Sequence, residues 1–259
     1  MTLAPAPSGV VGGVSFVVLG EGGPVTIFAH GLGGSVAETR PLATRVPGTR
    51  VLLDFRGHGD SALQPEGWDY DTLADDLLAV ADAVGASRAV GLSLGSGALL
   101  RALTRDPARF RKLAFVLPAV IDDTRRDKAT ERLHRLGAAI TAEDARAVAD
   151  VLLEELPAAV RTRRGVDALV LRRAQQLVTK PAPAPRFEDR PLHDRSLLLA
   201  LDVPTLVVTQ ASDALHPTEV GRALAAGIGA ELLELPEGGV FWTDAKRLQL
   251  ALADHLAED

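Results

Sequence analysis

Short apolar runs alternate with helix-like segments along most of this chain, and this rhythm limits the possible fold more than any other feature. From the third run onward, a helical stretch separates each predicted strand from the next, which is typical of a mostly parallel sheet with helices on both faces. The first two runs are joined by the glycine-rich segment 20–24, which favours a hairpin and therefore an antiparallel edge. The predicted strands are 14–19, 25–29, 51–53, 89–92, 113–117, 205–209 and 232–235.

The segment Gly91-Leu92-Ser93-Leu94-Gly95 has a GxSxG pattern between an apolar run and a helix-favouring segment. Such a pattern forms a sharp strand-to-helix turn with the serine at its corner, so the positions two residues away must be small. GxSxG alone is a weak signal, because a glycine-rich strand-to-helix turn can contain a serine by chance. The interpretation of Ser93 as a nucleophile therefore depends on the other motifs of the chain.

Two further motifs make the pattern specific: His30-Gly31-Leu32-Gly33-Gly34-Ser35 after the second strand, and residues 54–61 after the third. With the serine motif, they resemble the α/β-hydrolase superfamily over nearly the whole chain. The resemblance implies an α/β-hydrolase fold, a mostly parallel twisted sheet with helices on both faces and an inserted helical lid. It also implies that the backbone N–H groups of Leu32 and Leu94 form an oxyanion hole, with His30 shaping the loop.

A candidate triad acid follows the sixth predicted strand, where residues 205–209 lead into a polar loop that contains Asp213. This position agrees with the order Ser, then Asp or Glu, then His that the resemblance implies. The alternative is that Asp213 caps the predicted helix 218–226 or forms a turn, as aspartates often do. Asp122 and Asp123, which follow the fifth strand, are the fallback acids.

The loop after the last strand lacks the histidine that the resemblance implies, because residues 235–242 read Leu-Pro-Glu-Gly-Gly-Val-Phe-Trp. None of Gly238, Gly239 or Val240 can accept a proton from Ser93, and a serine hydroxyl without a base is a poor nucleophile near neutral pH. Removing the base from a triad typically costs on the order of 10⁶ in turnover. The sequence thus predicts a serine hydrolase with a non-standard or missing base.

Several explanations stay open at this point. His216, three positions after Asp213, or His30, beside the oxyanion loop, could act as a substitute base. Asp244 could reach inward, although its more ordinary role is to cap the last predicted helix, 245–257. The pocket could serve a lyase, isomerase or cyclase reaction without acylation of the serine, or the chain could be a catalytically inactive ligand-binding member of the fold. A deliberate replacement of the histidine would give the same sequence.

The middle of the chain breaks the strand rhythm and defines the predicted organisation. We expect a core domain in residues 1–118 and 196–259, interrupted by a helical lid insertion in residues 119–195. The insertion either shapes the substrate pocket or is a plain helical addition, and its proline run 181–185 acts as a semi-rigid tether. The predicted helices of the insertion are 125–136, 142–155 and 166–178.

Composition excludes several other functions. The chain of 259 residues has no cysteine, and its six histidines show no metal-ligand spacing, so we expect no metal site. No glycine-rich nucleotide motif is complete, which predicts no cofactor. A formal charge of −6 argues against nucleic acid as a partner. The start lacks the features of a signal peptide and no apolar run is long enough to cross a bilayer, so we expect a cytoplasmic protein. The partner that we expect from the resemblance is a small-molecule substrate.

Overall fold

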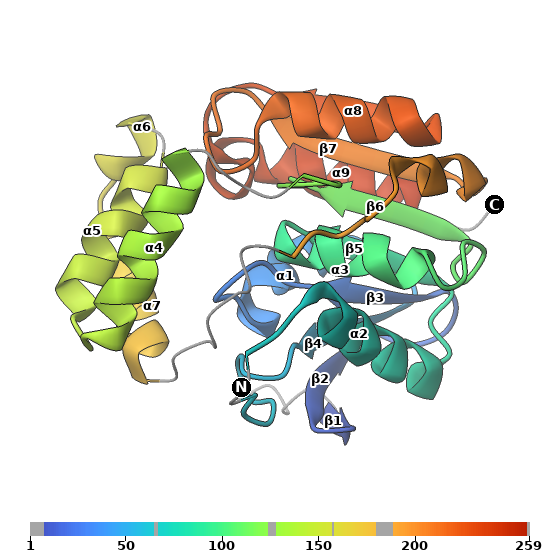
Figure 1. Cartoon of the computed structure of the whole chain (residues 1–259), viewed down its shortest axis with the longest axis horizontal. Coiled ribbons are helices and arrows are strands. Elements are labelled where there is room, and N and C mark those ends of the chain that lie inside the picture. The colour runs from blue at the N-terminus through green and yellow to red at the C-terminus, as the bar shows by residue number, and fades with distance from the viewer. Residues whose placement is uncertain (1–7, 65–66, 124–127, 157, 180–188, 258–259) are drawn as a thin grey trace.

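Eight strands form one sheet in the computed structural model of the chain, which describes residues 8–64, 67–123, 128–156, 158–179 and 189–257. The strand order is β1-β2-β4-β3-β5-β6-β7-β8 (Figure 1). The β1–β2 and β2–β4 pairs are antiparallel and the other pairs are parallel, which confirms the predicted mostly parallel sheet. The strands are β1 (Ser8–Val11), β2 (Val14–Leu19), β3 (Val25–Ala29), β4 (Thr49–Asp54), β5 (Arg88–Leu92), β6 (Lys112–Val116), β7 (Thr205–Gln210) and β8 (Glu231–Leu235).

The prediction that segment 20–24 closes a hairpin was wrong. β2 and β3 do not pair with each other; both pair with β4, β2 antiparallel on one side and β3 parallel on the other. The difference follows from burial: β3 is almost completely buried between β4 and β5, whereas most of β2 is only half-buried. A strand with apolar residues on both faces gains most from a place in the interior of the sheet.

The antiparallel edge exists, but β1 and β2 form it. Residues Gly12 and Gly13 connect these strands, and their φ angles of 57° and 85° lie in the left-handed region that glycine adopts without strain. A Gly-Gly pair between two apolar runs is a known signal for a tight hairpin turn. The sequence therefore contained the information for β1, and the prediction missed it.

Two layers of helices cover the sheet. Helices α2 (Tyr70–Val84), α3 (Leu94–Leu103) and α8 (Thr218–Ile228) pack with one face around a cluster that includes Leu77, Leu99, Phe115, Val207 and Leu224. Helices α1 (Val36–Ala43) and α9 (Ala245–His255) pack on the other face, around Phe28, Leu42, Val90, Val208 and Leu252. Successive residues of each parallel strand point alternately into one cluster and the other. The parallel part of the sheet is therefore buried on both faces.

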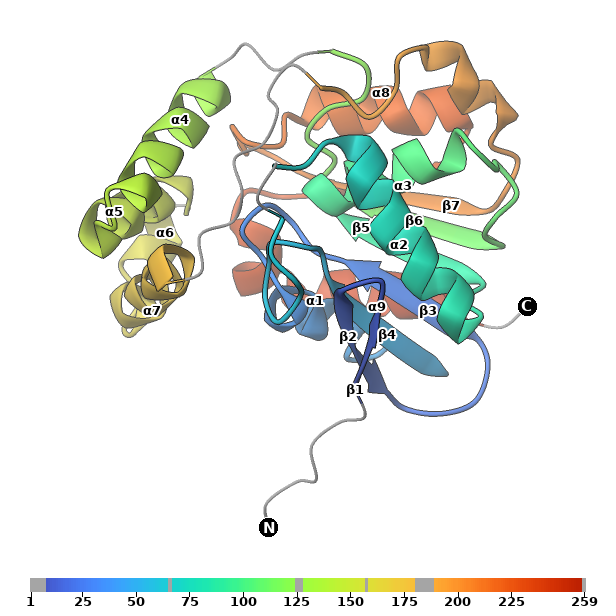
Figure 2. The ribbon, with the colours of Figure 1, turned by 60° about the horizontal axis from the view of Figure 1, so that its bottom comes forward.

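Helices α4 (Lys128–Thr141), α5 (Ala145–Glu155), α6 (Ala158–Arg161) and α7 (Val166–Thr179) form a helical insertion between β6 and β7. Figures 1 and 2 show it standing to one side of the layered core. It has an apolar cluster of its own, made by Val148, Leu152, Val160, Val170, Ala174 and Leu177, with Trp242 of the core packed against it. The insertion is therefore a small helical unit that contacts the core at selected points.

The helix bounds in the insertion differ from the predicted ones by a few residues. α5 begins at Ala145 and not at residue 142, because Asp144 is its N-cap and accepts hydrogen bonds from the amides of Arg146 and Ala147. Residues 125–127 of the first predicted helix and the proline run 181–185 lie outside the described residues, and the predicted bounds 119–195 stay a prediction. Within the described part of the chain, no helix combines the length and apolar character needed to cross a bilayer.

Candidate active site

Ser93 stands at a sharp corner between β5 and α3. Its φ of 51° and ψ of −107° are unusual for a residue with a side chain. The flanking glycines explain how the chain can turn there: a Cβ on Gly91 would lie 2.5 Å from the carbonyl oxygen of Gly95, and a Cβ on Gly95 would lie 2.4 Å from that of Ala29. Both contacts involve backbone atoms, which cannot move aside. The GxSxG pattern therefore forms the predicted strand-to-helix turn.

His216 lies beside this serine. The Nε2 atom of His216 is 2.8 Å from the Oγ of Ser93, and its Nδ1 atom is 2.9 Å from the Oδ2 of Asp213. The side chains of His216 and Asp213 are only 15% and 17% exposed, so the hydrogen bonds of the pair are partly shielded from water. With the Nδ1 proton directed at the carboxylate, Nε2 is free to accept the proton of the serine hydroxyl.

The same aspartate folds the loop and orients the ring. Oδ1 of Asp213 accepts hydrogen bonds from the amides of Leu215 and His216, at 2.9 and 3.1 Å, which forms a tight turn directly after the positive φ of Ser212. Burial raises the pKa of Asp213, but its bonds with His216 and with the two amides outweigh burial and hold that pKa below its usual value. Asp213 thus stays ionised beside the imidazole. Of the alternative roles, helix capping does not apply, because the N-cap of α8 is Pro217, whereas Asp213 does form a turn.

The loop after β8, where the resemblance implies a histidine, has a different structure. Residues Gly239–Thr243 form a single π-helical turn, η2. Val240 is 2% exposed and points into the core, while its amide donates to the side-chain oxygen of Gln210 at 2.6 Å. Trp242 packs against the helical insertion. This loop therefore supports the core and the insertion, whereas the loop after β7 supplies both groups beside Ser93.

His30 is a structural residue in this geometry. Its ring is fully buried, with Nδ1 bonded to the carbonyl oxygen of Gly31 at 2.7 Å and Nε2 accepting from the amide of Phe55 at 3.0 Å. Because both ring nitrogens are occupied by backbone groups, His30 has none left to accept a proton from Ser93. Burial lowers the pKa of His30, and it lowers the pKa of the neighbouring His58 to about 4, so both rings are neutral at pH 7.

The loop that contains Leu32 lies against the serine. A Cβ added at Gly31 would lie 3.5 Å from the Cβ of Ser93, so the two segments are neighbours. The other predicted oxyanion donor, Leu94, is the first residue of α3, where an amide has no partner within its own helix. The positive end of the helix dipole also lies at this position. The two amides predicted from the resemblance therefore come from segments that flank the serine.

The other predicted groups lie elsewhere. Asp122, a fallback acid, forms an ion pair with Arg195, whose Nε is 3.0 Å from its Oδ2. Asp244 is the N-cap residue of α9 without a side-chain capping bond, and its Oδ2 accepts from the hydroxyl of Thr243 at 2.9 Å. Within the described residues, no group of three His, Cys, Asp or Glu side chains could hold a metal ion.

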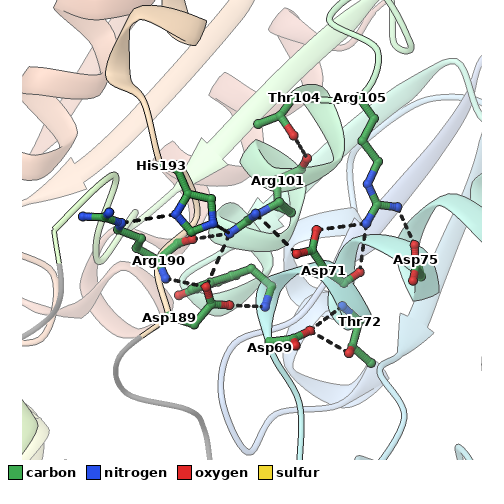
Figure 3. A network of polar contacts seen from close by, with 11 residues as sticks. Asp69, Asp71, Thr72, Asp75, Arg101, Thr104, Arg105, Asp189, Arg190 and His193 are labelled. Atoms are coloured by element: carbon green, nitrogen blue, oxygen red, sulfur yellow. Dashed lines mark hydrogen bonds and ion pairs between the residues drawn. The ribbon is translucent and has the colours of Figure 1, made fainter.

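A buried arginine network behind α3 was not predicted. Arg101 of α3 is bonded to the carbonyl oxygen of Arg190 at 2.6 Å and to His193 at 3.1 Å, and Asp189 lies 3.4 Å from it (Figure 3). Asp189 also accepts from the amide of Tyr70 at 2.6 Å. These bonds join α2, α3 and the chain that returns from the insertion. No sequence signal distinguishes Arg101 from an exposed arginine, since its partners lie 30 to 92 positions away along the chain.

The comparisons with known proteins agree with the fold. The family model described as Alpha/beta hydrolase family matches residues 26–251, and the chain belongs to this family. The chain is 28% identical over 249 residues to a Klebsiella pneumoniae protein named "Putative carbamate hydrolase RutD", and the match covers 91% of this chain and 92% of that protein. It is 27% identical over 251 residues to an AB hydrolase superfamily protein of Bacillus subtilis, with 91% and 92% covered.

Three other similarities are more limited: one concerns part of a longer protein, and two concern the fold alone. The chain is 28% identical over 233 residues to the dihydrolipoyllysine-residue acetyltransferase component of the acetoin cleaving system of Pseudomonas putida, and spans 60% of its length. The crystal structure of an enol-lactonase from Burkholderia xenovorans has a TM-score of 0.78 at 21% identity, with 97% of this chain and 100% of that chain covered. A thermophilic esterase from Thermogutta terrifontis gives 0.75 at 19% identity, with 98% of each chain covered.

Proposed function

We propose that this protein is a serine hydrolase that acts on an ester or a related acyl substrate through Ser93, His216 and Asp213. The observation that carries the proposal is the continuous chain of hydrogen bonds from Asp213 through His216 to the Ser93 hydroxyl, with contacts of 2.9 and 2.8 Å. The alternative functions, a lyase, isomerase or cyclase reaction or ligand binding without catalysis, were considered because the sequence lacks a histidine in the loop after β8. His216 supplies a group in the place that such a base requires.

The chemistry follows from the roles that these atoms can take. The Oγ of Ser93 attacks the carbonyl carbon while Nε2 of His216 accepts the hydroxyl proton. The amides of Leu32 and Leu94 stabilise the negative charge that develops on the carbonyl oxygen. The protonated His216 then gives its proton to the leaving alcohol, and the same ring activates a water molecule that hydrolyses the acyl-enzyme. Asp213 holds the ring in the required tautomer throughout.

Relatives indicate which substrates to try first. A relative named as a carbamate hydrolase covers most of this chain, and similar structures include an enol-lactonase and an esterase. All three activities begin with nucleophilic attack on an acyl carbon, which is the step that the proposed triad performs. A panel of test substrates should therefore contain a short p-nitrophenyl ester, an aryl carbamate and a simple lactone.

The test of this proposal uses the whole chain. A fluorophosphonate probe should label the wild-type protein at Ser93, as peptide mass spectrometry would show, and S93A should lose both labelling and turnover of the panel. Turnover retained by S93A at the wild-type level would overturn the proposal. S212A is a suitable control, because Ser212 lies in the same loop as the candidate base but has no role in the proposed chemistry.

A further inference from the structure

The oxyanion loop, residues Gly31–Gly34, is held by a side chain that the proposed chemistry does not use. Oε2 of Glu38, in the first turn of α1, accepts the amide of Gly31 at 2.8 Å. The loop closes so tightly over this carboxylate that a Cβ on Gly34 would lie 2.1 Å from the same oxygen. A charged acceptor makes this bond stronger than one between neutral groups.

Local sequence rules do not explain this contact. Ser35 is the N-cap of α1, and Ser35 with Glu38 forms the S-x-x-E pattern of a capping box, in which the glutamate turns back to the amide of the N-cap residue. In this structure the carboxylate instead reaches Gly31, four residues before the N-cap. Glu38 thus contributes to the loop beside Ser93 and does not serve its own helix alone.

The other oxygen of the same carboxylate faces the helical insertion. Oε1 of Glu38 lies 3.1 Å from Nη2 of Arg173 on α7. Leu177, one turn further along α7, touches the same loop, because a Cβ on Gly33 would lie 2.9 Å from its Cδ2. Residues four apart lie on one face of a helix, so α7 rests on the oxyanion loop with the face that carries Arg173 and Leu177.

These contacts fix the peptide that carries the Leu32 amide. The carbonyl group of Gly31 accepts from His30 Nδ1 at 2.7 Å and from the amide of Gly34 at 3.0 Å. The Gly31 carbonyl and the Leu32 amide belong to one planar peptide unit and point in opposite directions. Glu38 holds the N–H group of Gly31, and His30 holds its carbonyl group. The direction of the Leu32 N–H is therefore determined.

We propose that Glu38 is a positioning residue for the Leu32 amide and that, through Arg173, it links the position of α7 to the geometry of the oxyanion hole. The inference rests on the proposed function. The two links differ in strength. The Glu38 side chain is 17% exposed and its bond to Gly31 is charge-assisted, whereas Arg173 is 44% exposed, so its ion pair is screened by solvent.

The test compares four variants and one control variant of the whole chain of 259 residues. E38A removes both links and should lower kcat/KM on the order of tenfold to a hundredfold, which is the scale expected for a misplaced catalytic group. E38Q keeps an acceptor for Gly31 but loses the charge, and R173Q loses the ion pair, so each should lower kcat/KM by at most about fivefold. R173K should recover most of the wild-type value. R222Q, which breaks an exposed ion pair with Glu234 on α8 and β8, is the matched control.

A positioning role can be separated from general loss of structure. The fraction of Ser93 that the fluorophosphonate probe labels gives the active fraction of each variant. The loss of activity per active site should appear mainly as a lower kcat. Affinity for a trifluoromethyl ketone, which imitates the tetrahedral intermediate, should fall in proportion to kcat/KM. Equal losses of kcat/KM in E38A and R222Q, or an unchanged affinity for the ketone in E38A, would overturn the inference.

The link to α7 also has a readout that needs no turnover. Amide hydrogen exchange at Gly31 should accelerate strongly in E38A and measurably in R173Q, but not in R222Q. Unchanged exchange at Gly31 in E38A overturns the positioning role whatever the activity shows. If wild-type Ser93 takes no label and hydrolyses nothing, the proposed function fails, and the catalytic part of the inference fails with it.

Discussion

Two neighbouring loops at one end of the sheet differ in what they contribute. The loop after β7 contains Asp213 and His216 within a single turn and reaches Ser93. The loop after β8 directs Val240 into the core and Trp242 to the helical insertion. The side chain of Gln210, at the end of β7, connects them through the amide of Val240. If His216 is the base, as we propose, the fold fixes where a base must lie relative to the nucleophile but not which loop supplies it.

The largest expected effect comes from removing the histidine of the β7 loop. H216A should lower kcat for an ester by about a millionfold if His216 is the only base, because triad members act as a unit. Steady-state hydrolysis of a p-nitrophenyl ester at pH 7.5 measures it, and H134A, which removes an exposed histidine of α4, should keep full activity. Activity of H216A within tenfold of wild type would mean that another group acts as the base.

The next largest effect is the difference in kcat between two variants, each of which changes one acidic residue, one in each loop. D213N should lower kcat by about 10⁴, because an amide at this position favours the wrong tautomer of the base. D244N, which changes the acidic residue at the end of the β8 loop, should change kcat by less than about twofold. Circular dichroism of both variants would show whether the fold is intact. An equal loss in the two variants would mean that the β8 loop also takes part in the chemistry.

The smallest effect concerns the structural role of the β8 loop. W242A should destabilise the packing of the insertion by about 2 kcal/mol, below the value for a fully buried tryptophan because Trp242 is only half-buried. Hydrogen exchange should accelerate in α5 and α7 while the sheet keeps its protection. L250A, on the exposed side of α9, is the control. Unchanged exchange in the insertion would show that Trp242 does not anchor it.

Much of the fold could be predicted because its signals are local. The buried strands are continuous apolar runs, and Gly91 and Gly95 mark the turn at Ser93 through backbone clearances that no other residue meets. The partner of β2 was predicted wrongly, because a glycine-rich connection indicates a turn but not the side on which the next strand packs. Burial over the whole sheet decided that point when it placed β3 between β4 and β5.

The candidate site was predictable only in part. Ser93, Asp213 and the loop at Leu32 follow strand ends, and the ends of parallel strands meet at one edge of a sheet. His216 and His30 were both possible substitute bases in the sequence, since both lie near such ends. Glu38 was not predicted, because its capping-box pattern indicated a bond within its own helix, while the structure directs its carboxylate to Gly31 and Arg173.

By itself the sequence determined the family, the turn at Ser93 and the absence of a histidine from the loop directly after β8, since each depends on residue types at fixed short spacing. The tertiary structure decided which histidine meets the serine. Ser93 and His216 are 123 positions apart, and their contact depends on the direction of a loop that Asp213 folds by accepting two amides. That direction arises from hydrogen bonds in three dimensions, which the spacing of residues along a chain does not specify.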